Sequence, residues 1–423
     1  MNVLFANFIL FLITALFFYK KFNRINFYVF LWIANAFSAF MSYYCVSQGY
    51  YYNTDVNLGY KLPIIPYVAN YLFTFIALYP FYSFNEKKVS WTLNDINLKY
   101  SNVFINISLY IFIINAILNL SNVFIASQIG FYEIYQSNQT EGVNLLSFSN
   151  PLLSTIHNWS GTYYQIVRTI IIVLLISKLI YTKWQSKKYI FQLLLCFIPS
   201  LLNSTASASR GGLFFLFADF IFIYILIKSI VPYKIKKIIT STIFIIIGFM
   251  IFFAIQISIS RFVENGNEET FPATIRYFGE GMANLGDLYY GKVRHHPMGE
   301  MFFPEFFDTH IFNNPEDFFS YWSKETGVPI AFFGTLFGDC YIQFGLVGAY
   351  IFIFILTSIW KSLFFKYNIT YIPFVMYYFL KFGVAGLFGY GFYDQRVHLL
   401  FIFLILTVFF IRKKHNGLQT KRR

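Results

Sequence analysis

Charged side chains are scarce in this chain, and their scarcity excludes a soluble protein. Only 12% of the 423 residues are Asp, Glu, Lys or Arg, whereas 57% are hydrophobic and the mean hydropathy is +0.56. A soluble domain of this length could not keep that balance in water, so lipid is the solvent for most of the chain. Only helices and closed barrels satisfy backbone polar groups in lipid, and the long continuous apolar runs favour helices.

Cysteine is also rare. Cys45, Cys196 and Cys340 are far apart and fall in or beside apolar segments, so they give no readable disulfide framework or thiolate metal site. The first apolar run has no preceding basic region and is followed by Lys20 and Lys21, which is the reverse of a cleavable signal peptide. We therefore expect this run to be retained as the first membrane span.

The apolar runs predict an all-α, polytopic integral membrane protein with about eleven spans, within a range of ten to twelve. The expected spans are 2–19, 27–46, 64–84, 102–126, 161–181, 189–204, 211–230, 238–259, 338–360, 369–390 and 396–412. They form a single transmembrane domain over residues 1–423, with two long outer loops at 127–160 and 260–337. Phenylalanine-rich runs in the second loop, such as 302–307, suggest short amphipathic helices on the outer leaflet.

Basic residues concentrate in every second connection, which predicts the orientation. These connections and the C-terminal tail carry 22 of the 32 basic residues but only two acidic ones, Glu86 and Asp95. Cytoplasmic loops retain Lys and Arg, so we expect the N-terminus outside, the C-terminus in the cytoplasm and the large loop 260–337 on the outer face. The net positive charge then reflects topology and attraction to anionic lipid, and nucleic acid is not an expected partner.

Away from the ends of the expected spans there are three charged residues: Arg168, Asp219 and Lys381. Each costs about 2.5–3.5 kcal/mol on insertion scales, so it should face a polar cavity or a partner. By these span boundaries Arg168 and Lys381 lie within about two turns of the outer surface, and Asp219 lies near mid-depth. The two cations suggest a bound anionic headgroup. The alternative is a structural bridge from either cation to Asp219 or Asp339.

The motif Ser209-Arg210-Gly211-Gly212 stands at the expected outer start of a span. Its glycines permit close backbone approach, and the first amides of the helix point outward beside the Arg210 guanidinium. This arrangement could bind a diphosphate, or it could only anchor the span at the interface.

The stretch from Arg276 to Asp287 in the large loop places Arg276, Glu280 and Asp287 near one face if it is helical. An arginine that neutralises a leaving phosphate and a carboxylate that takes a hydroxyl proton are the groups that glycosyl transfer requires. An ordinary i,i+4 ion pair on a solvated helix is the alternative.

Histidines cluster later in the same loop, in Arg294-His295-His296 and at His310, among several carboxylates. They could supply a general base, contact a phosphate, or belong to a plain polar loop. The spacing matches no metal-binding pattern, so we predict no metal and no other cofactor.

Small residues recur from Gly334 to Gly348, in a stretch that is long for the start of one span. Close helix packing explains the glycines without function, and a short re-entrant segment lining a cavity is the alternative.

Together these features resemble the bacterial O-antigen or repeat-unit polymerases of the Wzy type. The resemblance is carried by Ser209-Arg210-Gly211-Gly212, the large late outer loop with Arg276-Tyr277-Phe278, and the segment Gly334 to Gly348. It implies a metal-independent membrane glycosyltransferase of the bacterial cytoplasmic (inner) membrane. Such an enzyme polymerises undecaprenyl-pyrophosphate-linked oligosaccharide repeat units into O-antigen or capsular polysaccharide on the outer face. Donor and acceptor glycans, membrane lipid and a chain-length regulator are the partners it implies.

The resemblance also implies roles for individual residues. Arg210 and Arg276 match by position the arginines that hold the diphosphate, and Glu280 with His295 or His296 would orient or deprotonate the acceptor. The remaining expected diphosphate contacts are Arg168, Arg261, Arg294, Lys381 and Arg396, and the expected sugar-stacking rings are Tyr277, Tyr289, Tyr290 and Trp322. An O-antigen ligase, a lipid-linked oligosaccharide flippase or other transporter, and a non-enzymatic assembly partner are the alternatives.

Overall fold

The structure is a computed structural model, and it describes residues 2–91, 98–130, 133–134, 148, 150–207, 210–237, 240–241, 248, 252, 270–303, 315–364 and 367–387. Within these ranges the chain is helical, and the only extended pairing is an isolated parallel bridge between Ser90 and Asn368. Seven of the described helices are long and apolar enough to cross a membrane, as in a multi-pass helical membrane protein.

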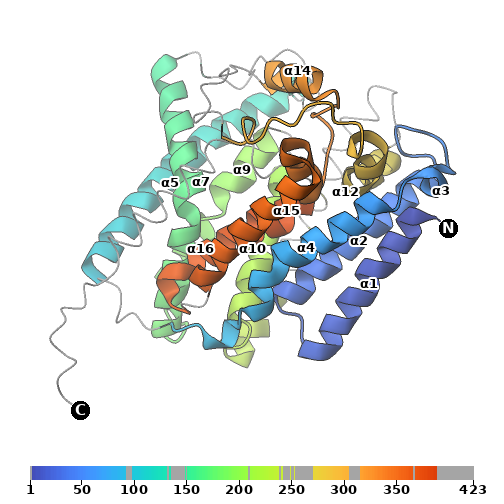
Figure 1. The fold of residues 1–423 in the computed structure, drawn as a ribbon. Coiled ribbons are helices and arrows are strands. Elements are labelled where there is room, and N and C mark those ends of the chain that lie inside the picture. Colours follow the sequence, from blue (N-terminus) through green and yellow to red (C-terminus); the bar gives the residue numbers. More distant parts are fainter. Residues whose placement is uncertain are drawn as a thin grey trace.

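The helices follow one another along the chain as labelled in Figure 1. They are α1 (Val3–Phe22), α2 (Phe27–Ser47), α3 (Leu58–Lys61), α4 (Ile65–Ser83), η1 (Glu86–Lys88), α5 (Leu98–Ile129), α7 (Pro151–Tyr181), α8 (Lys187–Leu195), α9 (Ile198–Ala206), α10 (Arg210–Ile227), α12 (Thr270–Asn284), the π-helix η4 (Leu285–Tyr289), α14 (Pro315–Thr326), α15 (Leu336–Phe364), η5 (Ile369–Tyr371), α16 (Ile372–Tyr378), the π-helix η6 (Phe379–Val384) and η7 (Ala385–Leu387).

Nine of the predicted spans coincide with these helices; the span 396–412 and all but four residues of the span 238–259 fall outside the described residues. Of the nine, α4 and α10 are less apolar or shorter than the seven candidate spans. The predicted span 189–204 is two helices, α8 and α9, that meet at a break at Cys196. Eleven spans therefore remain a prediction, whereas a bundle of apolar helices is what the described residues form.

The predicted outer loop 127–160 is too long, because α7 begins at Pro151 and not at 161. Asn150 caps this helix by accepting a hydrogen bond from the Leu152 amide, and proline is favoured at a first helical position. Polar residues such as His157 and Asn158 make the first turns resemble a loop in sequence. In the structure both residues line a cavity.

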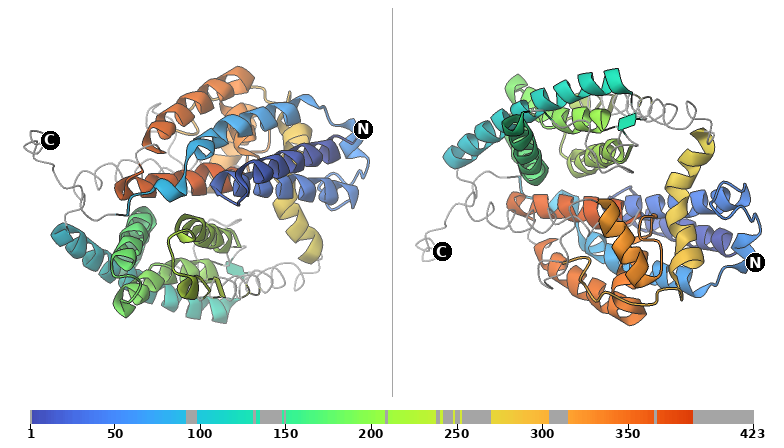
Figure 2. Two further views of the ribbon diagram at one scale, coloured as in Figure 1. Left: turned by 90° about the horizontal axis from the view of Figure 1, so that it is seen from below. Right: turned by 90° about the horizontal axis from the view of Figure 1, so that it is seen from above.

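The helices form two groups that pack on either side of a central segment (Figure 2). One group contains α1, α2, α4 and α15, and the other contains α5 and α7 to α10. The segment from η5 to η7 lies between them and is the most buried of the seven candidate spans, with 89% of its apolar window inside the protein. Rings from both sides meet it: Phe379 lies 5.5 Å from Phe27 of α2 and 5.4 Å from Phe222 of α10, between ring centroids.

Helix α12 crosses the top of the bundle in the view of Figure 1 and joins the two groups (Figure 2, right). A Cβ at Gly279 would overlap the Met41 backbone of α2, so only glycine permits this approach. On the other side the Phe278 ring lies 6.0 Å from that of Phe214 near the start of α10. The large loop therefore packs into the bundle here, whereas most of the run 302–307, expected to form a short helix on the leaflet, lies outside the described residues. Phe302, from the run 302–307, lies buried in a turn, 5.8 Å from the Phe344 ring.

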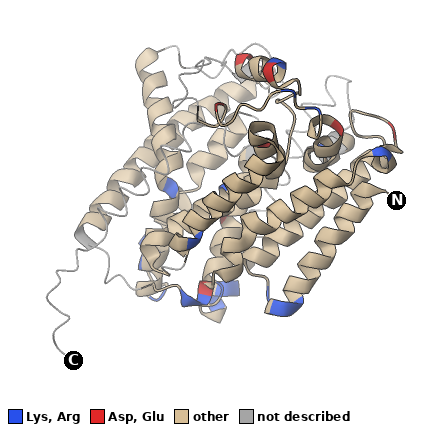
Figure 3. Cartoon of the chain, viewed as in Figure 1, with Lys and Arg blue, Asp and Glu red and all other residues tan. Residues whose placement is uncertain are grey.

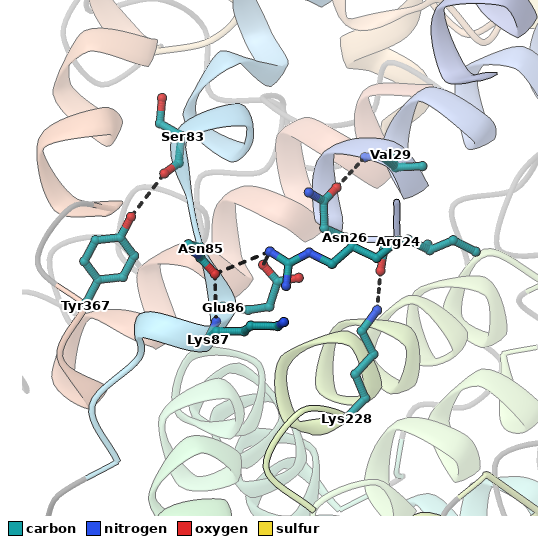
Figure 4. A network of polar contacts seen from close by, with 10 residues as sticks. Arg24, Asn26, Val29, Ser83, Asn85, Glu86, Lys87, Lys228 and Tyr367 are labelled. Carbon is teal, nitrogen blue, oxygen red and sulfur yellow. Dashed lines mark hydrogen bonds and ion pairs between the residues drawn. The ribbon is translucent and has the colours of Figure 1, made fainter. Parts of the chain in front are cut away.

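Basic side chains gather at the opposite end of the bundle from α12 and α14 (Figure 3). There a polar network ties together the turns between helices (Figure 4). Arg24, after α1, lies 3.5 Å from the buried Glu86 carboxylate and 3.4 Å from the Asn85 side-chain oxygen. Lys228, after α10, donates to the Ile25 carbonyl. This network fixes the basic ends of α1, α4 and α10 relative to one another.

Candidate substrate-binding cavity

A cavity of about 410 Å³ lies between α5, α7, α9, α10 and the central α16–η6 segment. Its wall is polar although the surrounding helices are apolar. The residues that line it are Asn115, Asn119, His157, Asn158, Gly161, Thr162, Tyr164, Gln165, Ile166, Arg168, Thr169, Pro199, Ser200, Asn203, Ser204, Gly212, Phe215, Tyr377, Leu380 and Lys381. A polar cavity inside an apolar bundle is the usual mark of a functional site in a membrane protein.

Arg168 of α7 is the first charged residue of this wall. Its guanidinium lies 2.6 Å from the Asp219 carboxylate of α10, so the structural bridge that the sequence left open is formed. Asp219 is fully buried, and the Arg168 side chain is 12% exposed. Since α7 begins early, Arg168 is about 26 Å along this helix, near its middle, and not within two turns of its end. Helix α7 thus places its cation at the same depth as Asp219.

Lys381 brings a second cation to the same cavity from the central segment. It lies in the π-helix η6. Single π-turns are rare in proteins as a whole, and those that occur are often at functional sites. Two of the predicted diphosphate contacts, Arg168 and Lys381, therefore converge on one cavity from helices far apart in sequence.

The motif Arg210-Gly211-Gly212 also reaches the cavity. Helix α10 begins at Arg210, and Gly212 in its first turn is part of the wall. A Cβ at Gly212 would overlap the Ser204 hydroxyl of α9, so glycine is needed for this close packing. For Arg210 and Gly211 the structure describes only the backbone. The start of α10 thus lies at the wall through Gly212.

The break between α8 and α9 shapes the opposite side of the wall. Pro199 has no N–H to continue the helix from Leu195, and the chain interrupts its helix there. The Tyr164 hydroxyl of α7 donates to the Cys196 carbonyl at 2.7 Å, so this carbonyl at the break has a hydrogen-bond partner. The Arg168 guanidinium lies 5.5 Å from the Tyr164 ring centroid, so one tyrosine supports both the break and the cation.

A chain of hydrogen bonds that the sequence analysis missed forms another part of the wall. Asn119 donates to the carbonyl and the side-chain oxygen of Asn115, and its own oxygen lies 3.1 Å from His157 Nε2. Asn115 in turn donates to the Ser160 hydroxyl. The available signal was the i,i+4 pair of asparagines inside an apolar helix, because buried amides need partners in lipid.

The predicted residues of α12 lie outside this cavity. Arg276 Nε is 3.9 Å from the Glu280 carboxylate, and its guanidinium lies over the Tyr52 ring at 4.6 Å. The ordinary i,i+4 pair is thus present. One turn on, Tyr51 donates to the Asn284 side chain at 2.6 Å. Burial, and secondarily the nearby Asp287 carboxylate, raise the pKa of Tyr51 well above its ordinary value. The Tyr51 hydroxyl therefore stays protonated and acts as the donor.

His296 is the better positioned of the two adjacent histidines. The structure breaks α15 at Gly345, whose φ of 69° and ψ of −177° suit glycine almost alone. His296 Nδ1 lies 2.9 Å from the Ile342 carbonyl before this break, and the Met298 amide donates to the Gln343 carbonyl at 2.8 Å. The small-residue stretch therefore contains a short first helix, 336–344. His296 supplies a partner that its broken end requires.

The other predicted residues of the large loop are dispersed. Tyr289 and Trp322 are 1% and 3% exposed and pack with Met301 in a small core, so they offer no open face for a sugar. Tyr290 stacks on Tyr341, and Tyr277 packs edge-on against Phe333. Arg294 and His295 are exposed, and Arg261, His310 and Arg396 lie outside the described residues.

Comparisons of the chain with known protein families, with curated proteins and with solved structures found no match. Among the residues that the structure describes, no three histidine, cysteine or carboxylate side chains come together as a metal site. What the cavity could bind therefore follows from its lining: two cations, a helix start and a set of amides around a space of about 410 Å³.

The Arg168–Asp219 pair gives a test of the buried wall. Arg168→Met should leave a buried carboxylate without compensation and lower the free energy of unfolding by about 3–5 kcal/mol, and Asp219→Leu should do the same for the guanidinium. Thermal unfolding in detergent measures both. The double variant should recover most of the loss, because it removes both charges. A double variant no more stable than either single one would contradict a direct pairing.

Gly345→Ala tests the break in α15. The backbone strain of a non-glycine residue there should cost about 1–3 kcal/mol, because a φ of 69° with a ψ of −177° is adopted almost only by glycine. A methyl would lie in ordinary contact with the His296 ring, 3.4 Å from Nε2, so packing should add little. Gly291→Ala is the matched control, because Gly291 also has a positive φ of 73° but lies in an exposed turn with open space around its Cβ. We expect a larger loss of thermal stability for Gly345→Ala. Equal losses would show that the break in α15 demands glycine no more than an exposed turn does.

Proposed function

We propose that this chain is a membrane glycosyltransferase that joins oligosaccharide repeat units carried on undecaprenyl pyrophosphate into a surface polysaccharide, as the Wzy-type polymerases do. The observation that carries this proposal is the cavity of about 410 Å³ with Arg168 and Lys381 in its wall. Cationic side chains held inside an apolar bundle suit a ligand that is both anionic and lipid-linked.

The hydrogen-bonding state of Arg168 supports a ligand in addition to Asp219. The bridge uses one terminal nitrogen, and the Nε atom is buried with no hydrogen-bond partner in the described part of the chain. An unsatisfied buried donor is costly unless something binds it. A phosphate oxygen in the cavity would accept from such a guanidinium.

Catalysis in this proposal is electrostatic. The diphosphate leaves from the anomeric carbon of the donor sugar, and charge grows on its oxygens as the bond breaks. Cations held in place before the reaction stabilise that charge without a metal. Arg276 on α12 joins Arg210 at the same end of the bundle, because Phe278 packs on Phe214 one turn into α10. We assign both arginines to the diphosphate and Glu280 to the orientation of Arg276.

The orientation of the chain is part of the proposal. The basic end with Lys20, Lys21 and Arg24 faces the cytoplasm of a bacterial inner membrane, and α12 and α14 lie on the outer side, where lipid-linked repeats are presented. Reporter fusions within 291–300 test this directly. They should report an extracytoplasmic location, and a cytoplasmic one would place the arginines on the wrong side and end the proposal.

Arg210→Ala and Arg276→Ala should each leave the protein in the membrane but replace the ladder of polysaccharide lengths with single-repeat glycans. Lys324→Ala is the control, since Lys324 is an exposed cation of α14 to which we assign no role. Gel analysis of surface glycans from the source organism is the measurement. Ladders of wild-type length from both arginine variants would refute the assignment.

The same experiment separates the alternative functions. Polymer made by membranes that lack any lipid A core acceptor excludes a ligase. A flippase predicts that variants accumulate lipid-linked repeats on the cytoplasmic side, and an assembly partner predicts no effect of either substitution.

A further inference from the structure

We propose that the part of the cavity between α5 and the first half of α7 holds the acceptor sugar, and that His157 receives the proton of its attacking hydroxyl. This inference rests on the proposed function and adds a subsite and a catalytic residue to it. It stands on the hydrogen-bond network around His157, on the position of that network relative to Arg168, and on the chemistry of the lining residues.

The network fixes which nitrogen of His157 can accept a proton. Asn119 donates with its amide nitrogen to Asn115, so the Asn119 oxygen is the atom that faces His157 Nε2 at 3.1 Å. Because that oxygen can only accept, Nε2 carries the hydrogen in the neutral ring. Nδ1 is then the atom with a free lone pair. Asn115 and Asn119 are 2% and 1% exposed, so the network is protected from water that could reorient it.

The same helix carries the proposed proton acceptor and the cation. His157, Gly161, Tyr164, Gln165 and Arg168 follow one another at helical spacing, and all five line the cavity. His157 and Arg168 are eleven residues apart, or about 16 Å along α7. A sugar ring and a diphosphate placed end to end fill a distance of this order between the two side chains. Gly161 lies between them on the same face, where a Cβ would come within 3.5 Å of Asn115 Nδ2.

The lining residues match a carbohydrate at one end and a phosphate at the other. Around His157 the wall offers the exposed side-chain amide of Asn158, which can both donate and accept, as sugar hydroxyls require. Around Arg168 it offers cations. Among the described residues that line the cavity, none is acidic.

The reaction balances with these groups. The acceptor hydroxyl oxygen forms a bond to the anomeric carbon of the donor sugar, and the bond from that carbon to the phosphate oxygen breaks. The hydroxyl proton moves to His157 Nδ1, and the electron pair of the broken bond leaves on the diphosphate, next to Arg168 and Lys381. The proton then passes from His157 to solvent or to the released diphosphate. No oxidant, metal or further reactant is needed.

His157 suits this role better than the two histidines that the sequence favoured. His296 uses Nδ1 at the Ile342 carbonyl, where it satisfies the break in α15. Neither His295 nor His296 lines the cavity. His157 is half-buried and lies in the wall next to the amides.

His157→Gln is the decisive variant, because the glutamine amide can still donate to Asn119 but cannot take a proton. We expect chain elongation in isolated membranes, which contain the endogenous lipid-linked repeats, to fall by about a hundredfold or more. Thr155→Ala is the matched control. Thr155 is exposed on the same helix, binds only the Pro151 carbonyl, and does not line the cavity. A wild-type ladder from His157→Gln at wild-type abundance would overturn the inference.

Two further readouts separate a catalytic role from a structural one. Added imidazole should restore part of the elongation lost in His157→Ala, and the wild-type decline of rate at acidic pH should be absent from His157→Gln. The titratable groups that line the cavity with His157 in the described part of the chain are Tyr164 and Arg168 of α7, Tyr377 of α16 and Lys381 of η6. Failure of imidazole to restore any activity, with the acidic decline retained, would show that His157 only supports the helix pair.

Binding of undecaprenyl pyrophosphate without sugar distinguishes this inference from the proposed function. Purified His157→Gln should bind this probe as the wild type does, whereas Lys381→Ala should bind it at least tenfold more weakly. Wild-type elongation and wild-type probe binding by Lys381→Ala would refute the proposed function. Loss of probe binding in Lys381→Ala together with full elongation by His157→Gln would refute only the sugar subsite.

Discussion

A helix that breaks inside lipid has no water with which to satisfy its exposed backbone groups, so each break needs a partner from elsewhere in the protein. This requirement arranges the interior of the bundle. At the α8–α9 break the Cys196 carbonyl accepts from the Tyr164 hydroxyl, and at the break in α15 the carbonyls of Ile342 and Gln343 meet His296 and the Met298 amide. Each break thereby commits one side chain, Tyr164 or His296, to a backbone carbonyl. From the sequence alone, either side chain could have been a ligand for a substrate.

The same constraint explains why the cavity is polar. Asparagine, glutamine and histidine are costly in an apolar helix unless they bond to one another or face a wet space. The first half of α7 does both, since His157 bonds to Asn119 while its neighbours line the cavity. The first half of α7 is the more polar one, and the helix is nevertheless one of the seven candidate spans. Its two halves would suit the two parts of the proposed ligand, a sugar and a lipid phosphate.

Much of the fold could be predicted from the sequence because hydropathy decides it. Nine expected spans coincide with described helices, and the Arg168–Asp219 bridge was one of two outcomes that charge burial allowed. The start of α7 could not be located, because Asn150-Pro151 is a capping signal that the polar residues after it obscured. The convergence of Lys381 with Arg168 depends on how the central segment packs between two helix groups, and a single sequence contains no distance information of that kind.

Arg276 and Arg168, which the sequence favoured for the site, differ in how firmly the surrounding residues hold them. Arg276 lies over an aromatic ring and 3.9 Å from an i,i+4 carboxylate, and 19% of its side chain is exposed. Arg168 is held at 2.6 Å from a fully buried carboxylate and supported by Tyr164, so its departure would leave the Asp219 charge uncompensated. A transition state gains most from charges that do not reorganise. Of the cations that the proposed function assigns to the diphosphate, Arg168 is therefore the one that the protein holds most firmly, and Arg276 has more freedom to follow a ligand.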